Sequence, residues 1–339
     1  MIFEKSAPLI QHLPVMVDEI LTLLEPERGG WIVDGTLGLG GHTEAFLKQS
    51  ETVRVLAIDR DTEALALARQ RLAPFADRVI FVHGDFRDLR HILVQHHLTQ
   101  VFAILVDLGV SSWQLGQAHR GFSFQLNGPL DMRMDQTKSV TAAELVNTLS
   151  AEELANVIFE YGEEPASRRI ARRIVNERVK HPIETTEQLA ELVRRAVPFS
   201  PKQFRIDPAT RTFQALRIAV NRELEHLDQF VTDAIDHLLP DGKLAVITFH
   251  SLEDRLIKRA FRVEAGMENP VTDRRSLWLT PHHERTVPPK RISLVTKKPV
   301  VASEAEIDRN PRARSAKLRV CQRVSSFDSE ALFSPPLPA

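Results

Sequence analysis

The sequence contains a single cysteine, Cys321, among 339 residues. One cysteine excludes an intramolecular disulfide and a cysteine-based zinc site, and scarce cysteine is typical of proteins in a reducing cytoplasm. No apolar run approaches the roughly 20 residues that a membrane-spanning helix needs. The first residues, Met1–Lys5, lack the charged and apolar regions of a secretion signal. We therefore expect a cytoplasmic protein without membrane segments.

Other absences narrow the class of function. The chain has no Gly-x-Ser-x-Gly nucleophile elbow and no Walker phosphate loop. The sequence therefore does not support the function of a hydrolase or a nucleoside triphosphatase. The adjacent histidines His96–His97 and His282–His283 have no partner at metal-ligand spacing, and we predict no metal site. The net charge is −1, so a nucleic-acid partner would have to bind a local basic patch.

The most informative stretch is glycine-rich. Asp34–Thr43 lies between an apolar run and a helix-like segment. A strand, a glycine turn and a helix start in that order let backbone N–H groups approach a ligand closely. The spacing is not a strict G-x-G-x-x-G, because Thr43 stands where the last glycine would be. By itself the stretch leaves two alternatives, a nucleotide-type cofactor site and a tight strand–helix turn without a ligand.

An acidic residue supports the first alternative. Asp59 ends the apolar run Val53–Ile58, about 20 residues past the glycines, where a carboxylate can accept hydrogen bonds from ribose hydroxyls. It could instead cap the next helix, for which Asp61 is also a plausible N-cap. The register of Asp59 with the glycine turn favours the ribose.

Four apolar runs with helical intervals predict a doubly wound, mostly parallel α/β sheet. Ligands bind at the carboxyl ends of such strands, and the candidate residues at those ends are Gly40, Asp59, Phe86 and Asp107. A fifth strand comes far later, after the predicted turn Pro240–Gly242, and an antiparallel pair closes the sheet. The strands are expected at Trp31–Val33, Val53–Ile58, Arg78–His83, Val101–Val106 and Lys243–Phe249, with Arg291–Thr296 and Lys317–Cys321 as the closing pair.

The fourth and fifth strands are separated by an insert rich in helix starts. Ser150–Glu153 and Thr185–Gln188 fit the capping-box pattern, and we expect an all-helical domain. One helix from about Thr212 to Leu239 should return the chain to the sheet. The expected domains are residues 1–117 with 213–324, the helical insert 118–212, and a disordered tail 325–339.

Two parts of the insert could contact a nucleic acid. One is a basic helix after Pro165, usually a solvated face but here a concentrated positive surface. The other is Arg120–Phe124, where interleaved Phe and Arg could stack a flipped base and ordinary loop packing is an equal alternative. The basic residues of the helix are Arg168, Arg169, Arg172, Arg173, Arg178 and Lys180, and its expected apolar side is Ile170, Ile174, Val175 and Val179.

These stretches together resemble a known family. They span about residues 12–323 and comprise Asp34–Thr43, Leu56–Asp61, Asp107–Ser112, Arg120–Phe124, Gly128–Met134, Pro208–Arg217, Phe249–Arg255 and Asn310–Ser315. The chain resembles the RsmH (MraW) family of bacterial S-adenosylmethionine-dependent methyltransferases, which modify the N4 amine of a cytosine in small-subunit ribosomal RNA. The resemblance implies a Rossmann-like class I methyltransferase sheet and a helical substrate-recognition domain. It also implies ribosomal RNA in an assembled small subunit as partner and leaves a homodimer open.

The resemblance also assigns residues. Gly40, Gly41 and His42 would line the methionine end of S-adenosylmethionine. Asp59 would hold its ribose, Phe86 would pack near its adenine, and Asp107 with Gln114 would complete the pocket. The candidate substrate-binding residues are Arg120, Phe122, Phe124, Arg133 and His250.

Asp107 is the candidate catalytic residue. Enzymes that methylate exocyclic amines usually carry Asn/Asp-Pro-Pro-aromatic after the fourth strand, whereas this chain reads Asp107-Leu108-Gly109-Val110. We expect Asp107 to accept hydrogen bonds from the amine as the nitrogen loses planarity. The alternative for Asp107 is an acid at a helix N-terminus. For the whole protein, the alternatives are a nicotinamide dehydrogenase, a non-catalytic RNA-binding or ribosome assembly factor, and a DNA amino-methyltransferase.

Overall fold

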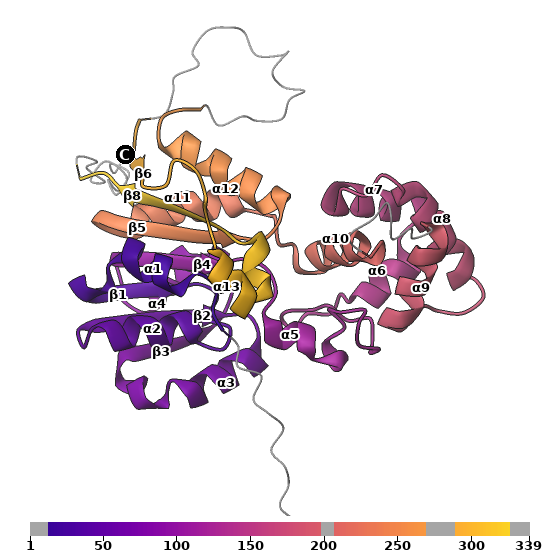
Figure 1. The fold of residues 1–339 in the computed structure, drawn as a ribbon, viewed down its shortest axis with the longest axis horizontal. Coiled ribbons are helices and arrows are strands. Elements are labelled where there is room, and N and C mark those ends of the chain that lie inside the picture. Colours follow the sequence, from indigo (N-terminus) through magenta and orange to yellow (C-terminus); the bar gives the residue numbers. More distant parts are fainter. Residues whose placement is uncertain (1–12, 198–206, 269–288, 326–339) are drawn as a thin grey trace, which may run out of the picture. The chain divides into compact units, whose positions relative to one another are not determined.

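The structure is a computed structural model that describes residues 13–197, 207–268 and 289–325 (Figure 1). The chain forms two compact units. We call residues 13–108 with 226–325 the sheet unit and residues 109–225 the helical unit. The helical unit is wider at both ends than the insert expected at 118–212. The tail 326–339 lies outside the described residues, as does the pair His282–His283.

The sheet unit is built on an eight-stranded mixed sheet in the order β3-β2-β1-β4-β5-β8-β6, with β7 also paired to β8. The first five strands are parallel, and β8 runs antiparallel to β5, β6 and β7. The predicted doubly wound, mostly parallel fold with a closing antiparallel pair is confirmed. The bounds are β1 Gly30–Asp34, β2 Val53–Asp59, β3 Val79–His83, β4 Val101–Asp107, β5 Leu238–Thr248, β6 Ile292–Leu294, β7 Val300–Val301 and β8 Lys317–Arg323.

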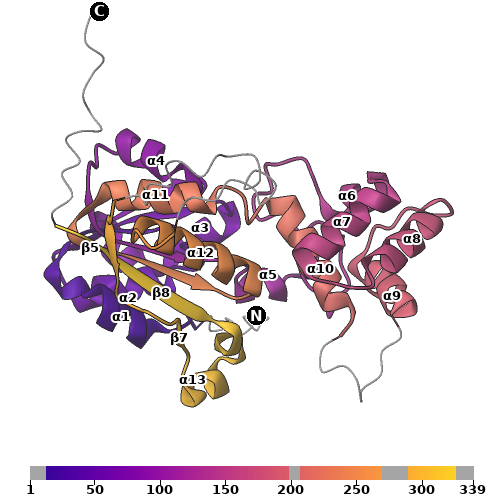
Figure 2. The same ribbon diagram turned by 90° about the horizontal axis from the view of Figure 1, so that it is seen from above.

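Helices cover both faces of this sheet (Figure 2). The strands β2 and β4 are almost entirely buried apolar runs, which is typical of parallel strands covered on both sides. One face packs against α1, α2 and α3 through a continuous apolar core. The other carries α4, α11 and α12. The bounds are α1 Val17–Leu24, α2 Gly41–Gln49, α3 Thr62–Arg71, α4 Leu89–Gln95, α11 Leu227–His237, α12 Ser251–Glu264 and α13 Glu304–Arg309.

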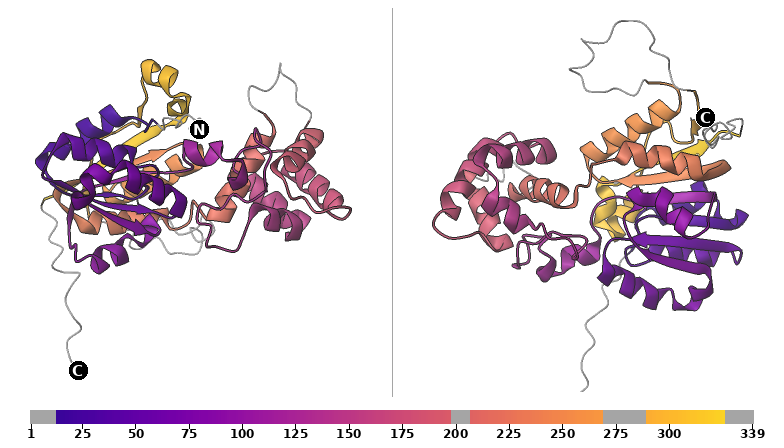
Figure 3. Two further views of the ribbon diagram at one scale, coloured as in Figure 1. Left: turned by 90° about the horizontal axis from the view of Figure 1, so that it is seen from below. Right: turned by 180° about the vertical axis from the view of Figure 1, so that it is seen from behind.

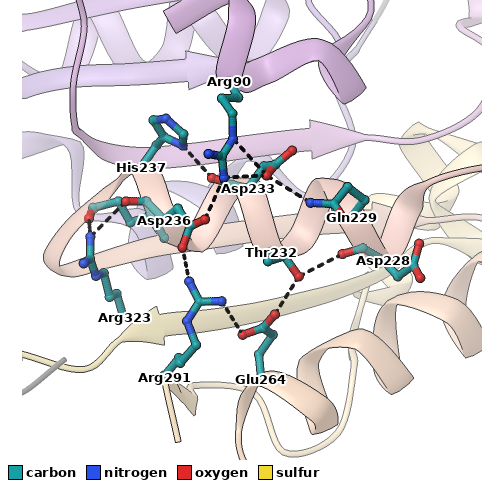
Figure 4. A network of polar contacts seen from close by, with 11 residues as sticks. Arg90, Asp228, Gln229, Thr232, Asp233, Asp236, His237, Glu264, Arg291 and Arg323 are labelled. Carbon is teal, nitrogen blue, oxygen red and sulfur yellow. Dashed lines mark hydrogen bonds and ion pairs between the residues drawn. The ribbon is translucent and has the colours of Figure 1, made fainter. Parts of the chain in front are cut away.

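A polar network joins the helices on the face of the sheet that carries α4, α11 and α12 (Figure 4). Arg90 of α4 bridges Asp233 and Asp236 of α11, with an Nη2–carboxylate distance of 2.9 Å to each. Arg291 contacts Asp236 and places its Nη1 2.9 Å from Oε2 of Glu264 in α12. These ion pairs link α4, α11, α12 and the residue that precedes β6.

The helical unit has its own apolar core. Its helices lie side by side, drawn from magenta to salmon in Figure 3. The two predicted capping boxes are confirmed: Ser150 and Glu153 cap α7, and Thr185 and Gln188 cap α9. The bounds are α5 Ser112–Gly116, α6 Ala142–Thr148, α7 Ala151–Gly162, α8 Ser167–Arg178, α9 Thr186–Ala196 and α10 Ala209–Asn221.

The single helix expected from Thr212 to Leu239 is wrong. The chain forms α10 and α11 instead, because Arg222 and His226 adopt left-handed φ angles of 52° and 57°. Within the helical unit, Glu223 accepts hydrogen bonds from Arg217 at 2.9 and 2.8 Å, which holds the turn that ends α10. The sequence has neither glycine nor proline at this break. Its helical pattern of apolar residues therefore continues from α10 into α11 without an interruption.

Two smaller expectations also need correction. The predicted turn Pro240–Gly242 lies inside β5, where the register jumps from the pair Val101–Leu238 to the pair Ala103–Lys243 and Asp241 has a φ of 62°. Val179 does not belong to the apolar side of the basic helix, because it follows the last residue of α8 and is 82% exposed. Within the described residues, no helix combines the length and apolar character that a bilayer crossing requires.

Candidate active site

The glycine turn joins β1 to α2 as predicted. Gly40 is the N-cap of α2 at φ 79°, and no side chain of the described residues caps the amides of the first helical turn. The turn packs tightly on one side, since a Cβ on Gly40 would lie 2.9 Å from Leu72 Cδ1 and one on Gly41 would lie 2.8 Å from Pro14 Cγ. A Cβ on Gly38 would meet nothing within 4 Å, although its φ of 52° favours glycine. The turn is therefore open at Gly38.

Asp59 is tied to this turn from the end of β2. Its Oδ2 accepts the Gly38 N–H at 2.6 Å, and its Oδ1 accepts the Asp61 N–H at 2.8 Å. Asp61, and not Asp59, caps α3 by accepting the amides of Glu63 and Ala64. Burial raises the pKa of Asp59 to about 6. The capping alternative for Asp59 is thus wrong, and its carboxylate borders the open part of the turn.

Asp34 at the end of β1 is a site residue that the sequence analysis did not single out. Its Oδ2 accepts the Thr43 hydroxyl at 2.7 Å, and its Oδ1 accepts the Thr36 N–H at 3.3 Å. The residue is 1% exposed, and burial raises the pKa of its carboxyl to about 6. The sequence shows Asp34 as the first residue of the glycine-rich stretch, but it does not show that the side chain is buried.

Asp107 ends β4. Its N–H donates to the Thr36 hydroxyl at 2.6 Å, while its Oδ1 is shielded from solvent and has no hydrogen-bond partner among the described residues. Burial, reinforced by the charges of Asp34 and Glu253, raises the pKa of Asp107 to about 8. The alternative as a helix N-terminal acid is wrong, because α5 begins only at Ser112 and is capped by Ser111.

Glu253 is a second acid that the sequence analysis did not single out. It lies in the first turn of α12, directly after β5, and is 1% exposed. Its Oε2 accepts the amides of Phe249 and His250, and its Oε1 lies 3.0 Å from His250 Nε2. His250 thus caps α12 and presents a polar ring beside this acid. The capping-box spacing from His250 to Glu253 was the signal that could have identified it.

The strand ends therefore gather acids with little compensating positive charge. The guanidinium of Arg312 is the cation whose charge acts on Asp107. Such a site favours a cationic ligand and disfavours the diphosphate of a nicotinamide dinucleotide. The uncapped first turn of α2 is suited to a carboxylate. A sulfonium compound with ribose hydroxyls and a carboxylate, such as S-adenosylmethionine, fits this set of groups.

Two predicted cofactor residues of the sheet unit pack away from open space. The His42 Nε2 donates to Val15 O at 2.9 Å, and burial lowers the pKa of the ring to about 4, so that it is neutral. Phe86 is 8% exposed, and its ring packs edge-on against Phe230 of α11 with centroids 4.8 Å apart. Both side chains are therefore engaged with neighbouring residues of the sheet unit.

The other predicted residues belong to the helical unit. Gln114 caps α5 together with Ser111. Arg120 is fully buried and donates to Arg133 O at 3.0 Å and Met134 O at 3.1 Å, while its guanidinium lies 5.8 Å from the centroid of the Phe122 ring. These interactions favour the loop-packing alternative for Arg120 and Phe122.

Phe124 and Arg133 are only partly buried, but both are also engaged within the helical unit. The Phe124 ring packs edge-on against Phe213, with centroids 5.1 Å apart. The Arg133 guanidinium pairs with Asp131, with an Nη2–Oδ2 distance of 2.6 Å. The structure thus gathers Gly40, Gly41, His42, Asp59, Phe86, Asp107 and His250 in the sheet unit, and Gln114, Arg120, Phe122, Phe124 and Arg133 in the helical unit.

The chain is similar to one protein family over nearly its whole length. A sequence model of the MraW methylase family matches residues 9–324. A protein of Oleidesulfovibrio alaskensis named ribosomal RNA small subunit methyltransferase H is 47% identical over 322 residues, covering 92% of this chain and 95% of its own. The protein of the same name from Magnetococcus marinus is 48% identical over 318 residues, covering 93% of this chain and 99% of its own.

Two solved structures that match the chain are more distant in sequence. An rRNA methylase from Streptococcus thermophilus is 11% identical with a TM-score of 0.36, covering 91% of this chain and 94% of its own. A putative rRNA-methylase from Clostridium thermocellum is 12% identical with a TM-score of 0.38, covering 91% and 95%. At this level the likeness supports no argument about the site.

Proposed function

The chain belongs to the MraW methylase family, and from this premise we propose that it methylates the N4 amine of a cytosine in small-subunit ribosomal RNA, with S-adenosylmethionine as methyl donor. The observation that supports this most directly is the environment of the Asp107 Oδ1 atom. The atom is buried at the carboxyl end of β4, it lacks a hydrogen-bond partner among the described residues, and it lies at the strand edge that carries the glycine turn.

The sheet unit is the cofactor domain in this proposal. When bound, S-adenosylmethionine supplies an electrophilic methyl group on a positively charged sulfur. Asp59 would accept the ribose hydroxyls, and the uncapped amides at the start of α2 would hold the methionine carboxylate. The buried carboxylates of Asp34 and Asp107 would favour the positive charge.

Asp107 would then act on the substrate amine. The lone pair of that nitrogen is delocalised into the cytosine ring, so alignment with the methyl carbon matters more than prior deprotonation. Asp107 Oδ1 would accept a hydrogen bond from the amine and take its proton as the methyl group passes from sulfur to nitrogen. Thr36 positions Asp107 through the hydrogen bond to its backbone N–H.

The helical unit is the RNA-recognition domain in this proposal, because one face of α8, which we call its outer face, carries exposed arginines. Its arginines Arg168, Arg169, Arg172 and Arg173 are all exposed, and no described carboxylate pairs with any of them. By contrast, Arg195 of α9 is paired with Glu191, with an Nη2–Oε1 distance of 2.6 Å. Unpaired guanidiniums on one face are suited to the phosphates of an RNA strand.

The remaining expectations follow from the substrate. We place the substrate RNA in an assembled small subunit and the protein in the cytoplasm where those subunits are. The homodimer stays a prediction that analytical ultracentrifugation tests.

The decisive experiment is methyl transfer from labelled S-adenosylmethionine to small subunits, followed by mass mapping of the modified nucleoside. We expect N4-methylated cytidine with the wild type and a loss of about 10²–10⁴-fold in rate with Asp107→Asn. The matched control is Asp88→Asn, which changes an exposed acid of the same unit. Retained RNA binding without any methylation by the wild type would favour an assembly factor, and methylation of DNA alone would favour the DNA enzyme.

A further inference from the structure

The turn that precedes β8 carries basic residues to which no role has been assigned. The segment Pro311–Ser315 forms a short 3-10 helix, and Ala313 and Ala316 anchor it in the sheet core with 1% exposure each. Asn310 Nδ2 donates to Leu13 O at 3.1 Å. The backbone around Arg312 is therefore held firmly, although its side chain is only half-buried.

Strand pairing places this turn at the reaction site. Asp107 of β4 pairs with Ile247 of β5, and Ile247 pairs with Leu318 of β8. Because β8 is antiparallel, its first residues lie at the edge where β4 and β5 end. Arg312 comes six residues before Leu318 and is close enough to Asp107 for the two charges to interact. In the order of the strands, the glycine turn and Asp59 lie on the β1 and β2 side of Asp107. Arg312 lies on the β5 and β8 side.

Arg312 differs from two other arginines of the sheet unit, the buried Arg319 and the partly buried Arg291. Arg319 pairs with Asp254 at 2.7 Å from Nε to Oδ1, and Arg291 pairs with Glu264 at 2.9 Å. Arg312 makes no hydrogen bond or ion pair with any residue in the described ranges 13–197, 207–268 and 289–325, and its charge is balanced only at longer range by Asp107. A guanidinium that has given up part of its hydration is stabilised by an anion that accepts its hydrogen bonds.

We infer that Arg312 binds a phosphate of the RNA strand beside the target cytidine and so brings the N4 amine to Asp107. This inference rests on the proposed function. The planar guanidinium fork is suited to bidentate binding of phosphate. A phosphate is favoured over the methionine carboxylate, because the glycine turn and the first amides of α2 lie across β4 from Arg312. The base would then enter from the β8 side while the donor occupies the β1 and β2 side.

The first test measures Arg312→Gln, Arg312→Lys and the control Arg314→Gln, which removes an exposed charge two residues away. We expect Arg312→Gln to raise KM for small subunits at least about tenfold, about 1.4 kcal/mol, with the Kd for S-adenosylmethionine by calorimetry unchanged. Arg312→Lys should recover part of the loss, since it keeps the charge but not the fork. Arg314→Gln should have a much smaller effect.

A second test identifies the phosphate. Small subunits are reconstituted with RNA that carries an uncharged methylphosphonate at either phosphate flanking the target cytidine. One of these replacements should raise KM for the wild type and have no further effect on Arg312→Gln, because both changes remove the same interaction. Additive effects for both replacements would overturn the assignment.

Other outcomes are equally informative. If Arg312→Gln weakens S-adenosylmethionine binding and leaves KM for RNA unchanged, the residue holds the cofactor carboxylate and the inference is overturned. If it only moves the pH profile of kcat upward, Arg312 acts on Asp107 alone and the inference is likewise overturned. A wild type that methylates ribosomal RNA while Arg312→Gln equals it in every parameter overturns the role of Arg312. A wild type that methylates no ribosomal RNA overturns the proposed function itself.

Discussion

The two units carry their unbalanced charge in opposite ways. In the sheet unit the unbalanced groups are buried acids, such as Asp107, whose Oδ1 has no hydrogen-bond partner among the described residues. In the helical unit the unbalanced charge is positive and exposed, on the outer face of α8. Buried charge is costly and is retained where a small ligand of opposite charge binds in a dry site. Exposed charge costs little and binds a large hydrated polyanion such as RNA. The contrast is consistent with our proposal that the sheet unit carries the chemistry and the helical unit binds the RNA.

The strongest way to test the sheet side of this contrast is Asp59→Ala. We expect the Kd for S-adenosylmethionine to rise at least about 100-fold, because each hydrogen bond to a charged acceptor contributes about 1.5–3 kcal/mol. Isothermal calorimetry measures the Kd, and Glu51→Ala, an exposed acid before β2, is the control. An unchanged Kd in a folded variant would reduce Asp59 to a structural partner of Gly38 and Asp61.

The recognition side is tested by replacing Arg168, Arg169, Arg172 and Arg173 of α8 with Gln. We expect KM for small subunits to rise about 10–100-fold, with the slope of log affinity against log salt reduced by about 0.7 for each phosphate that the variant no longer binds. S-Adenosylmethionine binding should not change. Arg195→Gln removes a charge that is already paired with Glu191 and should leave the slope as it is. An unchanged slope in the α8 variant would return that face to an ordinary solvated surface.

Asn221→Ala in α10 tests whether the two units act independently. The Asn221 side chain donates to Met132 O at 2.7 Å and accepts the Met134 N–H at 2.7 Å. Its removal leaves buried backbone groups unpaired, so we expect the free energy of unfolding to fall by about 1–3 kcal/mol in urea titrations. The control is Asn176→Ala on the exposed side of α8. If Asn221→Ala also weakens S-adenosylmethionine binding, the two units do not act independently.

The smallest expected effect is the pH dependence. With the pKa of Asp107 at about 8 and those of Asp34 and Asp59 at about 6, only Asp107 gains its charge between pH 7 and 9. The value of kcat/KM for S-adenosylmethionine should therefore rise about tenfold over that range, since it reports the free enzyme. The bound sulfonium should move the transition in kcat to lower pH.

Stability should change in the opposite direction. Folding raises the pKa of Asp107 from its ordinary value of 3.8 to about 8, so the native state holds a proton that the unfolded chain has released between these values. Stability falls as pH rises through this window. Asp107→Asn should remove both the kinetic and the stability transitions, and a wild-type rate profile that is flat between pH 7 and 9 would contradict the assignment.

Much of the fold could be predicted from local patterns. The apolar runs around Val55 and Ile104 correspond to β2 and β4, and the capping boxes at Ser150 and Thr185 correspond to the starts of α7 and α9. The break between α10 and α11 could not be predicted, because it depends on left-handed Arg222 and on the Arg217–Glu223 ion pair. Those features are set by packing and not by a glycine or proline.

For the site, the sequence by itself determined which acids end the strands, since hydrophobic periodicity locates a strand and its carboxyl end. That was sufficient to predict that Asp59 and Asp107 lie at the carboxyl ends of β2 and β4. Only the tertiary structure decided that Glu253 and Arg312 act on Asp107 and that Arg120 is buried. These residues are distant along the chain, and both the pKa of an acid and the accessibility of an arginine depend on the packing around them, which no local pattern of residues encodes.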